Sequence, residues 1–114
     1  MVETEPVLVV ARFRYEEALA DHALAELTSC VDQLSQRPGY LSGSVGRALD
    51  DPTLWLVSTT WMHVGAYRRA LSSYEIKMSV VPLLSHALDE PSAYEVLVGE
   101  GADPPNRAIP RGSN

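Results

Sequence analysis

The chain has 114 residues, of which 46% are hydrophobic, and its formal net charge is −6. This length predicts one globular domain. An acidic chain with nine scattered Lys and Arg residues is not expected to bind nucleic acid, whose phosphates require a basic face. The sequence has no apolar run of about 18 residues, so we expect no membrane-spanning segment.

The cysteine content and the N-terminus indicate the compartment. The single cysteine, Cys30, cannot form an internal disulfide and suits a reducing environment. The N-terminal residues Met1–Pro6 are acidic and lack the apolar stretch of a secretory signal. We therefore expect a cytoplasmic protein.

The first two predicted elements are a strand and a long helix. In Val7–Arg14 the apolar residues occupy every odd position, which predicts a strand with Arg12 on the opposite face. From Glu16 to about Gln36 the apolar residues recur at three- and four-residue steps, which is typical of one helix face. The Pro38-Gly39 pair predicts the end of this helix.

The next segment predicts a β-hairpin. Tyr40–Leu49 and Thr53–Trp61 flank the turn sequence Asp50-Asp51-Pro52. Gly43 and Gly46 weaken the first arm, and they indicate a bulge or a close backbone approach.

The C-terminal part predicts two helices, a strand and a tail. Val64–Leu71 predicts a short helix and Tyr74–Leu88 a further one, in which Pro82 either kinks the helix or begins its second part. Ser92–Val98 predicts the last strand. The domain then spans residues 1–98, and the Gly/Pro-rich residues 99–114 form a flexible tail or an arm on a partner subunit.

This order of elements predicts an α+β fold of the ferredoxin-like split βαβ type, with an antiparallel sheet and helices on one face. Both faces of the first strand are apolar, with Val9 and Phe13 on one side and Leu8 and Val10 on the other. The helices cover one face, so the other face needs a second cover. A homodimer packed sheet against sheet would provide it.

Three landmarks resemble a known family. Arg37-Pro38-Gly39-Tyr40-Leu41 follows the first helix, Asp50-Asp51-Pro52 forms the hairpin turn, and Trp61 closes the next strand. In this order and spacing they are similar to the antibiotic-biosynthesis monooxygenase domain, over about Val7 to Val98. The resemblance implies a dimeric α+β barrel with a pocket between the sheet and the helices of each subunit.

The resemblance also implies a range of activities. The best-understood relatives oxidise polycyclic phenols to quinones with molecular oxygen, and they use no flavin, heme or metal. Another branch binds and degrades heme, while others are isomerases or have no known activity. The heme branch's asparagine, pocket tryptophan and heme-ligating histidine fall at Ala11, Ala70 and Val80 here. We therefore expect no heme and no other cofactor.

The site residues of the quinone-forming relatives carry over in part. Their strand tryptophan and the tyrosine six residues later correspond to Trp61 and Tyr67. Their asparagine four residues before the tryptophan is replaced by Val57, and an arginine of the later helical segment falls near Val81. The aromatic half of that set is therefore retained and the polar half is not.

Three residues are candidates for the chemistry. Trp61 could stack on an aromatic substrate and offer its indole N–H, or it could be a core residue. Tyr67 could donate a hydrogen bond or relay a proton, or it could be a half-buried helix tyrosine. His63 could take a phenolic proton near neutral pH, or it could cap the following helix.

Four further residues are candidates for substrate binding: Arg12, Trp55, Tyr74 and His86. Arg12 could balance an anionic substrate or pair with an acidic residue at the dimer seam. The three histidines are dispersed and form no His-x-x-x-His pattern, so no metal site is expected.

These residues together predict a cofactor-independent monooxygenase that oxidises a polycyclic phenol or related aromatic with molecular oxygen. Val57 and Val81 favour an alternative, a non-catalytic dimer that binds an apolar ligand. An isomerase or cyclase that uses the same pocket is the third hypothesis, since one fold supports several functions.

Overall fold

Three long strands form the centre of the structure, and alternating apolar residues give two of them, the first and the third, a face to bury. They are β1 (Val7–Arg14), β2 (Tyr40–Arg47) and β3 (Leu54–Trp61), and a short β4 (Ala93–Glu95) adds an edge. The strand order is β2-β3-β1-β4, and every pair is antiparallel. This computed structural model describes residues 5–99, so nearly all of the predicted tail lies outside the described residues.

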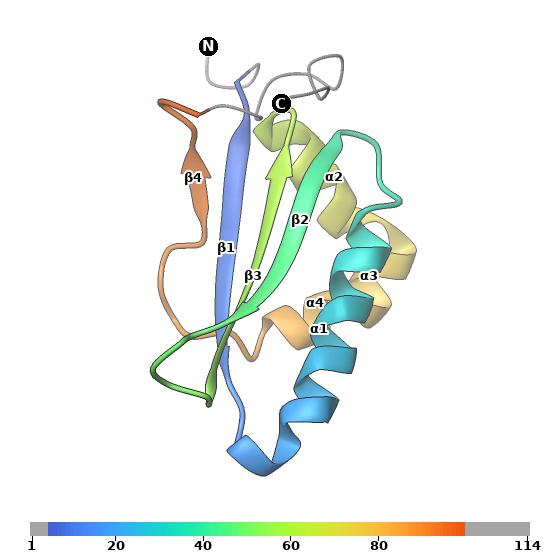
Figure 1. Cartoon of the computed structure of the whole chain (residues 1–114). Helices are drawn as coiled ribbons and strands as arrows, with labels where there is room; N and C mark the ends of the chain where they lie inside the picture. The colour runs from blue at the N-terminus through green and yellow to red at the C-terminus, as the bar shows by residue number, and fades with distance from the viewer. Residues whose placement is uncertain (1–4, 100–114) are drawn as a thin grey trace.

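The helices all lie on one face of the sheet, which we call the inner face (Figure 1). They are a 3-10 turn η2 (Glu17–Leu19), α1 (Ala20–Leu34), α2 (Val64–Ser72), α3 (Tyr74–Ser79) and α4 (Val81–Leu84). The predicted ferredoxin-like α+β fold is therefore confirmed. Within residues 5–99, no helix is long and apolar enough to cross a lipid bilayer.

Two hydrophobic clusters fill the space between the inner face and the helices. The first joins β1 and β3 to α1, α2 and α3 and is formed by Val7, Val9, Cys30, Leu34, Trp61, Ala66, Ala70, Ile76 and Val80. The second joins the other end of the sheet to α1 and is formed by Ala11, Phe13, Ala23, Leu27, Trp55 and Val57. Leu83 and Leu84 of α4 pack against both clusters. This short helix therefore lies where the two clusters meet.

The predicted helix over Tyr74–Leu88 is wrong at its C-terminal end, because helical structure stops at Leu84. Of the two alternatives for Pro82, a kink or the start of a second helical part, the structure shows the second. Because Pro82 has no N–H to donate to the preceding turn, α3 ends before it and α4 starts around it. His86 then donates its backbone N–H to Leu83 O (2.9 Å), which is a tight turn and not a continued helix.

Two other predicted boundaries are also wrong. The helix expected from Glu16 to Gln36 begins as the η2 turn, and its α-helical part spans only Ala20–Leu34. The strand expected over Ser92–Val98 is confined to β4, which pairs only with Val7–Val9.

Two glycines lie where a Cβ would overlap a neighbouring side chain. Gly39 has a φ of 90°, and a Cβ at this position would overlap the Cβ of Ala66 on α2. A Cβ at Gly43 would overlap the Tyr40 hydroxyl, whereas Gly46 has open space around it. The irregularity in β2 lies between Tyr40 and Ser42, so neither Gly43 nor Gly46 forms the bulge.

We expect Gly39→Ala to destabilise the protein by more than about 1 kcal/mol, because a left-handed backbone costs an L-residue roughly that much before any overlap is counted. Gly46→Ala is the matched control, and its effect should stay within about 0.5 kcal/mol. The free energy of unfolding in urea measures both. Equal unfolding midpoints for the two variants would contradict the account of Gly39.

Candidate functional site

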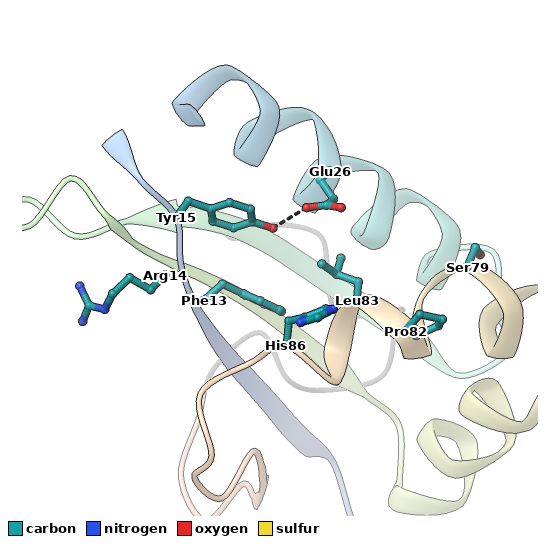
Figure 2. Close-up of a pocket in the computed structure, with 8 residues that line it drawn as sticks. All are labelled: Phe13, Arg14, Tyr15, Glu26, Ser79, Pro82, Leu83 and His86. Atoms are coloured by element: carbon teal, nitrogen blue, oxygen red, sulfur yellow. Dashed lines mark hydrogen bonds between the residues drawn. The ribbon is translucent and has the colours of Figure 1, made fainter. Parts of the chain in front are cut away.

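A cavity of about 450 Å³ lies between the end of β1, α1 and the α4 region (Figure 2). We call it the α1–α4 cavity. Its apolar wall consists of Phe13, Pro82 and Leu83. The polar groups around it are Arg14, Tyr15, Glu26, Ser79 and His86. An apolar wall that faces convergent polar groups is a feature of small-molecule sites.

Tyr15 enters this cavity because it continues the alternation of β1 by one residue. Its backbone N–H donates to Thr53 O (2.9 Å), which extends the pairing of β1 beyond Arg14. The side chain therefore lies on the inner face, as Phe13 does. Its hydroxyl donates a short hydrogen bond to Glu26 Oε1 (2.6 Å), shown as a dashed line in Figure 2.

Glu26 lies at the rim of the buried face of α1. Its helical neighbours Ala23, Leu27 and Cys30 are buried, while its own side chain is 39% exposed. The same Oε1 that accepts the Tyr15 hydroxyl also lies 3.5 Å from Nε2 of His22, which is one helical turn away. The carboxylate is thus held at the cavity wall by contacts from two elements.

The surroundings raise the pKa values of three tyrosines. Burial and then the hydrogen bond to Glu26 raise the pKa of Tyr15 well above its ordinary value. Burial is also the first cause of the raised pKa of Tyr40 and of Tyr67. These phenols therefore stay protonated over a wide pH range, and the Tyr15 hydroxyl remains a hydrogen-bond donor to Glu26.

His86 reaches the α1–α4 cavity from the turn that follows α4. Figure 2 shows its imidazole beside Leu83, on the side of the cavity opposite Glu26. An imidazole is the side chain whose ordinary proton affinity suits proton transfer near neutral pH. The cavity therefore combines an apolar wall with a potential proton acceptor.

A second cavity of about 340 Å³ lies between β1 and residues 84–92, and we call it the strap cavity. Tyr67 lines it from α2. The segment over it is tied to β1 by Leu88 N–H to Arg12 O (2.8 Å) and by Val10 N–H to Ser92 O (2.7 Å). The Arg12 guanidinium adds two hydrogen bonds to the Glu90 carboxylate, at 2.7 and 2.8 Å.

The sequence profile of the antibiotic biosynthesis monooxygenase family matches residues 6–79, which include β1, α1 and the hairpin. This chain belongs to that family. No curated protein sequence matches the chain significantly. Solved structures that resemble it include a variant of SnoaB, a cofactor-independent oxygenase from Streptomyces nogalater. That structure has 18% identity and a TM-score of 0.68, over 83% of this chain and 96% of that one.

Two further solved structures show the same fold. A conserved protein from Methanosarcina mazei has 20% identity and a TM-score of 0.65, over 82% of this chain and 94% of that one. A protein from Chloroflexus aurantiacus that carries the same family name also has 20% identity and a TM-score of 0.65. The match covers 86% of this chain and 99% of the Chloroflexus aurantiacus chain.

Trp61 lies in the core of this family member and lines neither cavity. Its side chain is fully buried, and its indole N–H donates to Thr59 Oγ1 (2.9 Å). Its ring lies between Tyr40 and Tyr67, with ring centroids at 5.5 and 5.6 Å. The indole N–H therefore already has an acceptor within the chain.

The other predicted residues are spread over the structure. His63 caps α2, because its Nδ1 accepts the Ala66 N–H (3.2 Å). Trp55 is buried under the Arg47 guanidinium, which lies 5.1 Å from its ring, and the side chain of Tyr74 is exposed. Of the site residues predicted from the sequence, only His86 lines the α1–α4 cavity. Tyr67 lies in the strap cavity, with Arg12 holding the strap.

Sequence reasoning missed Tyr15 and Glu26. Tyr15 is the next odd position after Phe13, so the alternation that predicts β1 also places it on the inner face. Glu26 comes three residues after Ala23 and four before Cys30, a spacing that places a carboxylate beside the apolar face of α1. Among residues 5–99, no group of three or more His, Cys, Asp or Glu side chains could hold a metal ion.

The raised pKa of Tyr15 predicts a pH dependence of stability. The protonated phenol contributes stability that is fully present below the unfolded tyrosine pKa of about 10 and is lost as pH rises through the folded pKa. We therefore expect the free energy of unfolding to fall above about pH 10. This fall should be smaller in Tyr15→Phe, as measured by urea unfolding at several pH values.

Tyr74→Phe is the control, since it removes one tyrosine hydroxyl from an exposed side chain. In this variant the free energy of unfolding should decrease at alkaline pH as much as it does in the wild type. Parallel alkaline curves for the wild type and Tyr15→Phe would contradict the half-buried, hydrogen-bonded state of Tyr15.

Proposed function

We propose that this protein is a cofactor-independent monooxygenase that oxidises a polycyclic phenol or related aromatic in the α1–α4 cavity. The observation that carries the proposal is the position of His86 in a cavity whose wall is formed by Phe13, Pro82 and Leu83. Membership of the monooxygenase family and the likeness to a cofactor-independent oxygenase support it.

The chemistry of such a reaction requires little from the protein. An electron-rich phenolate can itself reduce oxygen, so the site must bind the ring, accept a proton and exclude water. At a ring methylene, two hydrogens leave and one oxygen atom enters as a carbonyl, while the second oxygen atom leaves as water. In this proposal the His86 imidazole accepts the phenolic proton, and Phe13 and Leu83 contact the ring.

The assignment that follows from the family resemblance leads to a different location. Of Trp61, Tyr67 and His63, it is Tyr67 that lines the strap cavity, where its phenol is half-buried. The Trp61 ring packs against the Tyr67 ring, and the two ring centroids are 5.6 Å apart. The two locations therefore predict opposite effects on turnover for substitutions at His86 and at Tyr67.

We expect chelator-treated protein to take up oxygen with an anthrone, naphthol or hydroquinone substrate, matched by quinone formation. His86→Gln should lower this rate about 100-fold, the range expected for the loss of a proton acceptor. Tyr67→Phe and Trp61→Phe should each retain most of the turnover. Loss of activity in these two variants, with normal turnover in His86→Gln, would place the reaction at the strap cavity instead.

The second part of the proposal is a homodimer. The outer face of the sheet carries the half-buried side chains of Leu8, Val10, Leu54 and Leu56, and within residues 5–99 no helix covers it (Figure 1). A second copy of this chain presents the same apolar surface and is self-complementary about a two-fold axis. We propose that two outer faces pack against each other.

Val10→Lys should shift the protein toward the monomer, because it places a charge in the centre of this face. Leu49→Lys is the control, since Leu49 is fully exposed in the hairpin loop. Sedimentation equilibrium measures the dissociation constant of each variant. An unchanged constant for Val10→Lys would contradict the sheet-to-sheet dimer.

A second candidate function is binding of an apolar ligand without catalysis. Val57 is 4% exposed and belongs to the cluster of Phe13 and Trp55, at the place where quinone-forming relatives carry an asparagine. Aromatic binding without oxygen uptake across a substrate panel would support this function. Product formation under strict anaerobiosis would indicate an isomerase or cyclase.

A further inference from the structure

We infer that Glu26 determines the specificity of the α1–α4 cavity, where it selects a neutral aromatic substrate with a second hydroxyl group and rejects the carboxylated analogue. This inference rests on the proposed function for the location of the substrate. It goes beyond that function because it assigns a residue and a substrate class.

The first argument is the geometry of the Glu26 carboxylate. Its Oε1 accepts the Tyr15 hydroxyl at 2.6 Å, and this contact fixes the orientation of the group. Figure 2 shows the other oxygen directed away from Tyr15, and Glu26 is one of the residues that line the cavity. A carboxylate has about four acceptor positions, so capacity for a ligand donor remains.

The second argument is the charge around the cavity. Arg14 also lines it, but its Nη1 donates to Thr53 Oγ1 (2.7 Å) and Asp51 Oδ2 (3.1 Å) in the hairpin turn. Figure 2 shows this side chain extended away from the cavity. His22 Nε2 lies 3.5 Å from Glu26 Oε1, and His86 lines the opposite side of the cavity. Among residues 5–99, Glu26 is the one acidic side chain that lines the cavity.

The third argument is the chemistry of an ionised carboxylate. It accepts hydrogen bonds and donates none, so it favours a hydroxyl group on the ligand. A hydrogen bond to a charged group contributes about 1.5–3 kcal/mol, which corresponds to roughly a tenfold to hundredfold gain in affinity. A carboxylate on the ligand would face a like charge in a half-buried site, which disfavours binding. The cavity thus fits a dihydroxylated polycyclic aromatic, with one hydroxyl at His86 and another at Glu26.

The test compares two probes by titration calorimetry in the absence of oxygen. They are a dihydroxynaphthalene and the hydroxynaphthoate in which a carboxylate replaces one hydroxyl. Wild-type protein should bind the dihydroxynaphthalene at least about tenfold more tightly. Glu26→Gln should reduce this preference to within about threefold, because the amide has no charge while its oxygen still accepts the Tyr15 hydroxyl.

One variant serves as the control for charge. Glu16→Gln removes an exposed carboxylate outside the cavity and should keep the wild-type preference. Equal affinities in the wild type, an unchanged preference in Glu26→Gln, or binding of neither probe would each overturn the inference. Intact selectivity without oxygen uptake in air would contradict the proposed oxidation and leave the role of Glu26 standing.

Discussion

Leu83 and Leu84 pack against both hydrophobic clusters of the inner sheet face, and the position of the two cavities depends on this contact. Leu83 lines the α1–α4 cavity and Leu84 lines the strap cavity, so a helix of one turn separates the two. Pro82 makes that arrangement possible, because it has no N–H to continue the hydrogen bonding of α3, so α4 begins as a separate helix.

The Tyr15–Glu26 hydrogen bond connects the end of β1 to α1 and closes one wall of the α1–α4 cavity. It stabilises the packing and at the same time fixes one oxygen of a carboxylate at the cavity wall. Such a group is costly to bury without a partner, and the Tyr15 hydroxyl reduces that cost. The same interaction therefore serves the fold and, in our proposal, the choice of substrate.

The sequence predicted the fold well because the fold depends on periodicity. The odd positions of β1 and the three- and four-residue steps of α1 follow directly from which faces are buried. The ends of α4 and β4 could not be predicted, since they depend on tertiary contacts such as Leu88 N–H to Arg12 O. A local pattern contains no information about where such a contact stops an element.

The site was harder to predict, because a residue type does not reveal its partner. Trp61 and His63 have the chemistry of a site, but one donates to Thr59 and the other caps α2. Tyr15 and Glu26 look ordinary in the sequence and become a pair only when β1 and α1 pack together.

The crystal structure of the protein soaked with a dihydroxynaphthalene would test the central claim most directly. The account predicts the ring between Phe13 and Leu83 with a hydroxyl on Glu26; a ring against Tyr67 in the strap cavity would contradict it.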